Sequence, residues 1–256
     1  MANSVEKTMI ILRELSNCKN KPICLAELFQ ITGINKSTAS HILKTLSESG
    51  YVFRVSRKDG YLPGAELFML TRYGRYKEDI ALICHPLLKW LSNKTGATTI
   101  FTVMEGTKKY IVDHCENSYL YSDTGAQIID DTLYTTITGR IIISHLQELE
   151  ALKLYEKLNL AEKSGWDEVY DRTSFLNELK RLRQMDIITN ITYENGNILN
   201  GFASPVFKNR KCIGALGVVL SRTSDTEPIS ANEINRISKL TLKCRKEFER
   251  RLNFKL

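Results

Sequence analysis

Three polar side chains on one predicted helix have the chemistry needed to bind a nucleic acid. In the segment 33–50, GINKSTASHILKTLSESG, a helical periodicity places Ser37, His41 and Lys44 on a common face. That face is small, polar and basic. Short hydroxyls in a first helical turn allow close approach to phosphates and base edges, and the helix N-terminus adds partial positive charge. The pattern favours a helix that reads the major groove of DNA.

The same segment carries the signals that would hold this helix in place. Gly33 breaks the preceding apolar segment, Asn35 can cap the new helix, and Gly50 can stop it after Ser49. A buried stripe is predicted from the spacing of its apolar residues, Ala39, Ile42, Leu43 and Leu46. Together with predicted helices over Val5–Leu15 and Leu25–Thr32, the arrangement is that of a helix-turn-helix. The alternative is an amphipathic surface helix whose polar face is merely solvated.

A basic hairpin is predicted directly after this helix. Residues 51–64, YVFRVSRKDGYLPG, are rich in β-forming residues and break at Asp59-Gly60. Arg54, Arg57 and Lys58 would lie on or beside the tip, where they can meet the DNA backbone or the minor groove. Aromatic residues are expected to help pack this wing: Tyr51, Phe53 and Tyr61. The alternative is a solvated basic hairpin.

Two side-chain sets have residue types suited to catalysis, but their spacing argues against it. These are Asp113-His114-Cys115 and Ser144-His145. Neighbours in a strand face opposite ways, and neighbours on a helix are about 100° apart. The same objection weakens a metal site built from Cys84, His85, His114 and Cys115. The sequence also has no glycine-rich phosphate loop. We therefore expect no enzyme activity, metal or cofactor, and we interpret all six cysteines as reduced thiols.

Charge and hydropathy agree with a polyanion as partner. The 256 residues carry a formal net charge of +7. Residues 1–64 contain nine Lys or Arg and five Asp or Glu, so an excess of four positive charges lies in the first quarter of the chain. No apolar run approaches the roughly 18 residues that cross a bilayer, and no signal peptide is evident at the start. The expected location is the cytoplasm.

The rest of the chain predicts an α+β domain with an antiparallel sheet. A linker helix is predicted from Ala65 and a longer helix over 80–94, followed by strands, helices and a last helix opening at Ser230. Residues 141–158 are predicted to form one helical segment, and a further helix is predicted over 175–185. The domain prediction is 1–64 for the winged helix-turn-helix, 65–79 for the linker helix and 80–256 for the second domain.

The segments SVEKTMIILREL, LAELFQITGINKSTASHILKTLSESGYV and GYLPG resemble the IclR family of bacterial transcriptional regulators. The family's small-residue-rich helix start is similar to Lys36-Ser37-Thr38, and its wing-closing motif is similar to 61–64 with a proline inserted. Later, Thr138-Gly139-Arg140 and GFASPVFKNRKCIGALGVVLS resemble its effector domain. The resemblance implies a GAF/PAS-like α+β fold that binds a small organic effector and forms dimers or tetramers.

Matching these segments places seven residues at or beside the implied effector pocket: Tyr134, Ile137, Thr138, Gly139, Tyr193, Glu194 and Gly201. Tyr134 stands where the family usually has His, and Gly201 where a polar or thiol side chain can contact the ligand. The helix end near Gly139 would favour negative charge, whereas Glu194 would repel an anion if it faces the pocket. A carboxylate and a more hydrophobic or sugar-like ligand both remain open.

The leading interpretation is a sequence-specific DNA-binding transcriptional regulator, expected to be a repressor, that responds to a small-molecule effector. Its expected partners are double-stranded DNA with a palindromic operator, the effector, and further copies of the chain in a homodimer or homotetramer. The predicted DNA contacts are Lys36, Ser37, Thr38, His41, Lys44, Arg54, Arg57 and Lys58. One alternative is a protein-interaction adaptor whose helix-turn-helix has lost DNA affinity. Another is a second domain that only dimerises and has no pocket.

Overall fold

The computed structural model describes residues 3–18, 21–56, 58–70, 77–116, 129–130, 133–162, 165–194, 196–223 and 229–254. The chain divides into two compact units, 1–76 and 77–256. The division between residues 76 and 77 falls inside the predicted linker segment, 65–79. The predicted domain boundaries at residues 64 and 79 therefore stay a prediction.

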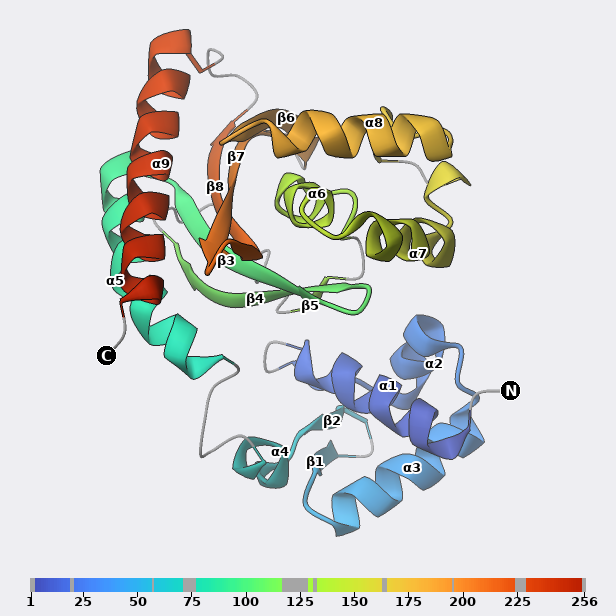
Figure 1. Cartoon of the computed structure of the whole chain (residues 1–256). Coiled ribbons are helices and arrows are strands. Elements are labelled where there is room, and N and C mark those ends of the chain that lie inside the picture. The colour runs from blue at the N-terminus through green and yellow to red at the C-terminus, as the bar shows by residue number, and fades with distance from the viewer. Residues whose placement is uncertain are drawn as a thin grey trace. The chain divides into compact units, whose positions relative to one another are not determined.

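The first unit combines α-helices with a two-stranded wing (Figure 1). Its elements are α1 (Ser4–Ser16), α2 (Leu25–Thr32), α3 (Lys36–Glu48), β1 (Val52–Ser56), β2 (Gly60–Pro63) and α4 (Ala65–Met69). The helices enclose a core that includes Ile11, Leu15 and Leu28, and the wing adds Val52 and Tyr61 to it. The predicted helix-turn-helix and hairpin are confirmed. Of the linker helix, the structure describes α4, while residues 71–76 lie outside the described part.

Local signals set the ends of α3. The N–H of Thr38 donates to Asn35 Oδ1 over 2.8 Å, so Asn35 caps the helix as predicted. Gly33 has φ of 67° at the end of α2, a conformation that favours glycine. One packing prediction for the wing is wrong: Phe53 is 59% exposed. It follows buried Val52 in a strand, so it faces away from the core, and a two-stranded ribbon has nothing to cover that second face.

The second unit is built on one antiparallel sheet of order β5-β4-β3-β8-β7-β6. Its strands are β3 (Thr98–Glu105), β4 (Lys108–Cys115), β5 (Ile129–Asp130), β6 (Ile188–Glu194), β7 (Asn197–Lys208) and β8 (Lys211–Thr223). Its helices are α5 (Glu78–Thr95), α6 (Ile137–Ser144), α7 (Glu148–Leu158), the 3-10 turn η1 (Leu160–Glu162), α8 (Arg172–Arg183) and α9 (Ala231–Asn253). The predicted α+β class and antiparallel sheet are confirmed.

Helices cover both faces of this sheet, so it has two cores. Helices α5 and α9 lie on one face, and α6, α7 and α8 lie on the other (Figure 1). Phe101 and Phe248 pack edge to face in the first core, with ring centroids 4.9 Å apart. Trp166 and Phe175 do so in the second, at 5.9 Å. The sheet therefore separates two hydrophobic layers.

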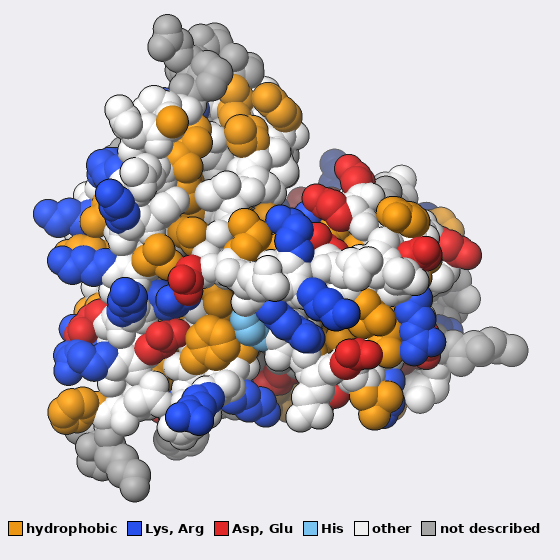
Figure 2. Space-filling model, turned by 45° about the horizontal axis from the view of Figure 1, so that its top comes forward, with side chains coloured by type: hydrophobic (Ala, Val, Ile, Leu, Met, Phe, Trp, Pro, Cys, Tyr) orange, Lys and Arg blue, Asp and Glu red, His pale blue; other side chains and the backbone are white. Residues whose placement is uncertain are grey.

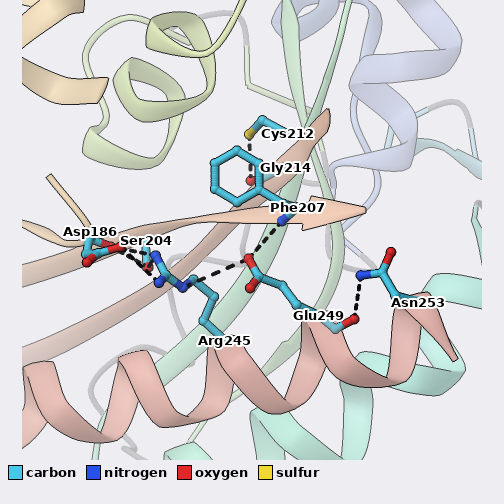
Figure 3. Close-up of polar contacts among 8 residues, drawn as sticks. All are labelled: Asp186, Ser204, Phe207, Cys212, Gly214, Arg245, Glu249 and Asn253. Carbon is cyan, nitrogen blue, oxygen red and sulfur yellow. Dashed lines mark hydrogen bonds and ion pairs between the residues drawn. The ribbon is translucent and has the colours of Figure 1, made fainter. Parts of the chain in front are cut away.

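Helix α9 is fastened to the sheet by a largely buried arginine (Figure 3). Arg245 is 8% exposed and pairs with Asp186 over 2.9 Å, while its Nη1 donates to Ser204 Oγ at 3.3 Å. One turn later, Glu249 Oε1 accepts the N–H of Phe207 at 3.0 Å. The outer side of the same helix is basic, with the exposed residues Lys239, Lys243, Lys246 and Arg250. Figure 2 shows Lys and Arg side chains along that side, at the left of the view.

Two helix predictions in this unit need correction. Residues 141–158 form two helices, because the backbone turns at residues 145–147. Arg183 donates to the carbonyl oxygens of Ser144 and Leu146, which takes those acceptors out of the helical ladder. The helix predicted over 175–185 begins three residues earlier, because Asp171 caps it in a capping box with Ser174. The last helix opens at Ser230 as predicted.

Candidate nucleic-acid interface and ligand cavity

Helix α3 buries one side and presents a polar side. Its apolar stripe is confirmed: Ala39, Ile42, Leu43 and Leu46 are each 8% exposed or less. Lys36, Ser37, His41 and Lys44 are exposed, and Thr38 is half-buried beside the cap. Residues 36–47 contain no acidic side chain. Because the buried stripe fixes the rotation of the helix, the polar side must face outward.

The wing holds its basic side chains on a fixed tip. Ser56 Oγ donates to Asp59 Oδ2 at 2.6 Å and accepts the N–H groups of Lys58 and Asp59 at 3.1 and 2.9 Å. A Cβ at Gly60 would lie 2.3 Å from the carbonyl oxygen of Ile23, so the turn demands glycine. Lys58 is exposed at this tip.

Arg54 is the second described cation of the wing. It is exposed on β1, with its guanidinium carbon 5.7 Å from the ring centre of buried Tyr61. Arg57, the third predicted cation, lies outside the described residues. The described wing thus offers two solvent-facing cations, which is the chemistry of a phosphate contact.

A cavity of about 220 Å³ lies between the start of α6 and the sheet in the second unit. Residues 135–138 and Lys109 line it, together with residues of β3, β6, β7 and β8. Gly201 forms part of its wall. Because glycine has no side chain, Asn190 and Ile137 have room there, whereas a Cβ would lie 2.3 Å from Asn190 Oδ1 and 3.0 Å from Ile137 Cδ1. Gly217 lets α6 approach the sheet, because its Cβ would lie 2.8 Å from Thr138 Cγ2.

The polar end of the cavity is organised around one hydroxyl. Thr136 Oγ1 accepts hydrogen bonds from the Lys109 ammonium at 3.0 Å and from the N–H of Gly139 at 3.3 Å. This hydroxyl therefore both caps α6 and holds the lysine. Thr138 Oγ1 lies 3.5 Å from it. Lys109 is only 5% exposed. A positive charge, two hydroxyls and a helix N-terminus therefore converge at one end of a space whose other lining is largely apolar.

The seven predicted pocket residues do not all reach this cavity. Ile137, Thr138 and Gly201 line it. The Gly139 N–H is taken by Thr136, and a Cβ at residue 139 would lie 1.7 Å from the carbonyl oxygen of Leu133, so this glycine serves close packing.

Two of the remaining predicted pocket residues, Tyr134 and Tyr193, do not line this cavity. Tyr134 packs into the second core, and its carbonyl accepts Arg140 Nε at 2.9 Å. Tyr193 is 77% exposed. The backbone of Glu194 ends β6, and its side chain lies outside the described residues.

Sequence reasoning missed Lys109, Thr135, Thr136, Asn190 and Thr192, all of which line the cavity. For Lys109 a signal existed. Adjacent residues of a strand point to opposite faces, so one of Lys108 and Lys109 had to point toward the face of the sheet that α6 covers. Asn190 and Thr192 share a face with buried Ile188 by the same alternation, although nothing in their residue types indicates a cavity.

The residues considered for catalysis do not form a nucleophile and a base. Ser144 Oγ lies 3.0 Å from His145 Nδ1, but Nδ1 also lies 2.9 Å from the carbonyl oxygen of Ile141. A carbonyl only accepts, so Nδ1 carries the proton and cannot take one from Ser144. Burial also lowers the pKa of His145.

The residues 113–115 likewise do not form a nucleophile and a base. Asp113 Oδ2 lies 2.9 Å from His85 Nδ1 of α5, and Asp113 Oδ1 accepts the backbone N–H of His114 at 2.8 Å. Burial raises the pKa of the Cys84 and Cys115 thiols, which disfavours the thiolate. Within the described residues, no group of three or more His, Cys, Asp or Glu side chains is placed to hold a metal ion.

Comparisons with known proteins agree with this architecture. Residues 4–56 match the family model of the IclR helix-turn-helix domain, and residues 76–246 match that of the bacterial transcriptional regulator IclR C-terminal domain. The chain belongs to the IclR family of bacterial transcriptional regulators. It is therefore a DNA-binding regulator with a C-terminal effector domain, and the resemblance inferred from sequence is confirmed.

Individual relatives are distant but similar over most of their length. The HTH-type transcriptional regulator XynR of Escherichia coli is 24% identical over 88% of this chain and 89% of its own. The glycerol operon regulatory protein of Streptomyces coelicolor is 25% identical over 84% and 83%. The transcriptional repressor IclR of Escherichia coli is 24% identical over 55% and 52%.

Solved IclR-family structures share the fold. The Thermotoga maritima IclR structure aligns with a TM-score of 0.68 over 98% of this chain and 99% of its own, at 20% identity. An IclR homolog from Microbacterium hydrocarbonoxydans, complexed with 4-hydroxybenzoate, aligns at 0.70 over 98% and 99%, at 13% identity. Among the described residues, no helix is long and apolar enough to span a membrane.

Proposed function

We propose that this IclR-family chain is a cytoplasmic repressor that binds a palindromic operator as a homodimer or homotetramer. A small organic effector in the 220 Å³ cavity changes its affinity for that DNA. The chain has no catalytic role of its own. The observation that carries this proposal is the outward polar face of α3, on which Lys36, Ser37 and His41 are exposed and Lys44 lies 3.8 Å from Glu48 at the helix end, beside a wing with exposed cations. Relatives named as repressors, among them the acetate operon repressor of Salmonella typhimurium, support the direction of control.

On DNA, α3 enters the major groove with its N-terminal turn foremost. Lys36, Ser37 and Thr38 approach phosphates and base edges, and His41 and Lys44 follow one and two turns later along the same side. Arg54, Arg57 and Lys58 contact the flanking backbone. One short helix reads few base pairs, so a specific site requires two copies related by a two-fold axis.

The effector occupies the cavity between α6 and the sheet. Thr138 and Ile137 contact it from the helix start, and Gly201 supplies the open side. A neighbour of the same fold is complexed with 4-hydroxybenzoate, which supports a small organic ligand for this chain as well. The cavity is below the roughly 300–1,000 Å³ of drug-sized sites, so the ligand is a small metabolite.

The deciding experiment changes only the exposed face of α3. A triple variant, Ser37→Ala, His41→Ala and Lys44→Ala, leaves the buried stripe intact and should keep the circular dichroism and melting temperature of the wild type. Its affinity for a DNA site selected from a random pool should fall by about 100-fold or more, since each lost base contact costs about 1–3 kcal/mol.

A matched control replaces two exposed lysines of the second unit, Lys153 and Lys180, with Ala. This pair should bind the selected DNA as the wild type does. If the folded triple variant kept full DNA affinity, this face of α3 would not contact the DNA and the proposal would be wrong. If the wild type selected no DNA site at all, the helix-turn-helix would be acting as a protein-interaction adaptor.

A further inference from the structure

A second cavity lies between α5 and α9, the two helices on the face of the sheet opposite α6 (Figure 1). We propose that this cavity is a separate binding site for a small aromatic anion, held by Trp90 of α5 and by Lys243 and Arg251 of α9. No described residue lines both this cavity and the first one. The inference therefore does not rest on the proposed effector role of the first cavity.

The shape of the second cavity follows from the packing of two helices. On α9, Lys243, Glu247 and Arg251 follow one another at a spacing of four, so they form one row along the helix. Pro86 and Trp90 of α5 have the same spacing and line the other side. The volume is about 320 Å³, within the roughly 300–1,000 Å³ of small-molecule sites. The cavity thus runs between a charged row and an apolar row.

The buried part of the lining is apolar. Leu87 is 7% exposed and Cys244 is 2% exposed, with Cys244 Sγ 3.6 Å from the carbonyl oxygen of Leu87. Burial raises the pKa of Cys244 to about 12, so this thiol stays uncharged. Trp90 is half-buried and adds its indole ring to the wall. Because aromatic pairs gain more than their buried area alone provides, a ring suits this wall better than an aliphatic chain.

The charged row has a surplus of positive charge. Glu247 Oε1 accepts hydrogen bonds from Arg251 Nε and Arg250 Nη2, each at 2.8 Å, and Oε2 accepts one from Arg250 Nε at 2.7 Å. Hydrogen bonds from Arg250 and Arg251 lower the pKa of Glu247 to about 2, so the carboxylate stays ionised. With Lys243, three positive charges stand against this one negative charge. The surplus favours an anionic ligand.

Both cations of the cavity can reach such an anion. Arg251 donates to Glu247 through Nε, and a guanidinium has five N–H donors, so its Nη groups can bind a carboxylate. The Lys243 ammonium lies 5.7 Å from the ring centre of Trp90, which places a cation beside the aromatic wall. Lys243 and Arg251 are exposed. An aromatic acid can therefore place its ring against Trp90 and its carboxylate at the two cations.

Fluorine NMR of the full-length protein labelled with 5-fluorotryptophan tests this binding in the unaltered sequence. The chain has two tryptophans: Trp90 lines the cavity, and Trp166 is 2% exposed in the core on the other face of the sheet. The probes are 2-naphthoate and 2-naphthamide, which share a ring and differ in charge. 2-Naphthoate should shift the Trp90 signal, leave the Trp166 signal in place, and bind about ten-fold more tightly than the amide. Trp90→Phe assigns the two signals.

A double variant locates the preference for the anion. Lys243→Met with Arg251→Met removes both cations that line the cavity, while Arg250 still pairs with Glu247. In this variant, 2-naphthoate should bind no more tightly than 2-naphthamide. The matched control is Lys239→Met with Lys246→Met, because both lysines are exposed on the same helix and do not line the cavity. The control should keep the wild-type preference.

The inference is overturned if 2-naphthoate leaves the Trp90 signal of the wild type unmoved, or shifts it no more than the amide does. It is also overturned if the folded double variant keeps the preference for the anion. Loss of the Trp90 response in Gly201→Phe would place the ligand in the first cavity instead. A Trp90 signal that changes with protein concentration, and not with 2-naphthoate, would assign the second cavity to a contact with another copy of the chain and would equally overturn the inference.

Discussion

Filling the cavity from the position of Gly201 should abolish the ligand response without unfolding the protein. The backbone at Gly201 is not in the left-handed region, so a side chain meets only a problem of space. A Cβ would lie 2.3 Å from Asn190 Oδ1, at the far end of a flexible side chain, and 3.0 Å from Ile137 Cδ1. Asn190 can swing away, after which the phenyl ring of Gly201→Phe enters the 220 Å³ cavity between apolar walls.

The substitution should lower both the folding stability and the ligand affinity. Overpacking a core costs about 1–3 kcal/mol, which lowers the melting temperature of a domain this size by about 2–4 °C per kcal/mol. To bind, a ligand must first return the ring to water, which costs about 1.5–3 kcal/mol and weakens binding by about 10- to 150-fold. Affinity for DNA without ligand should stay near that of the wild type.

Calorimetry with the small organic ligand that binds the wild type best measures this effect. Gly201→Ala should give a smaller loss, and Ile191→Phe is the control, since it adds a ring at an exposed position of the same sheet. Equal ligand affinity in the wild type and Gly201→Phe would refute the reasoning, because the ligand would then bind elsewhere.

Three further predictions concern the capping of α3, the wing and a buried histidine. Asn35→Ala should destabilise the first unit by about 1 kcal/mol in urea unfolding, and Asn35→Ser, which keeps a capping oxygen, should restore most of it. Replacing Arg57 and Lys58 with Ala should weaken specific and random DNA alike and flatten the slope of log K against log salt by up to about two; an unchanged slope would mean that the wing does not contact phosphate. Burial lowers the pKa of His145 below the ordinary histidine value of 6.5, so the unfolded chain binds the proton more tightly. Stability is then full above pH 6.5 and is lost as the pH falls toward the lowered value, and His145→Gln should reduce the drop in urea midpoint between pH 7 and pH 5.

The helices of the first unit could be predicted from the sequence because local signals set their ends. Asn35, Gly33 and Gly50 act through hydrogen bonds and backbone angles within a few residues, so their effect is visible in the chain itself. The exposure of Phe53 could not be predicted in the same way, because the alternation of side chains along a strand does not say which of its two faces will be covered.

The cavity depends on contacts that are distant in sequence. The break between α6 and α7 is fixed by Arg183, which reaches carbonyls of residues 144 and 146 from α8. Lys109 reaches Thr136 only because β4 pairs with β3 in the observed register. Family resemblance indicated the start of α6 and the strand with Gly201, but it did not reveal the lysine between them.

The most direct test of the account is a footprint on the selected DNA site, made with and without a small organic ligand that binds the cavity. The account predicts protection of two related half-sites, centred one helical turn of about 10–10.5 base pairs or a multiple of it apart, by an assembly of at least two copies. It also predicts that protection changes with the ligand in the wild type and stays constant in Gly201→Phe. Protection of a single asymmetric half-site by a monomer, with no response to the ligand, would contradict it.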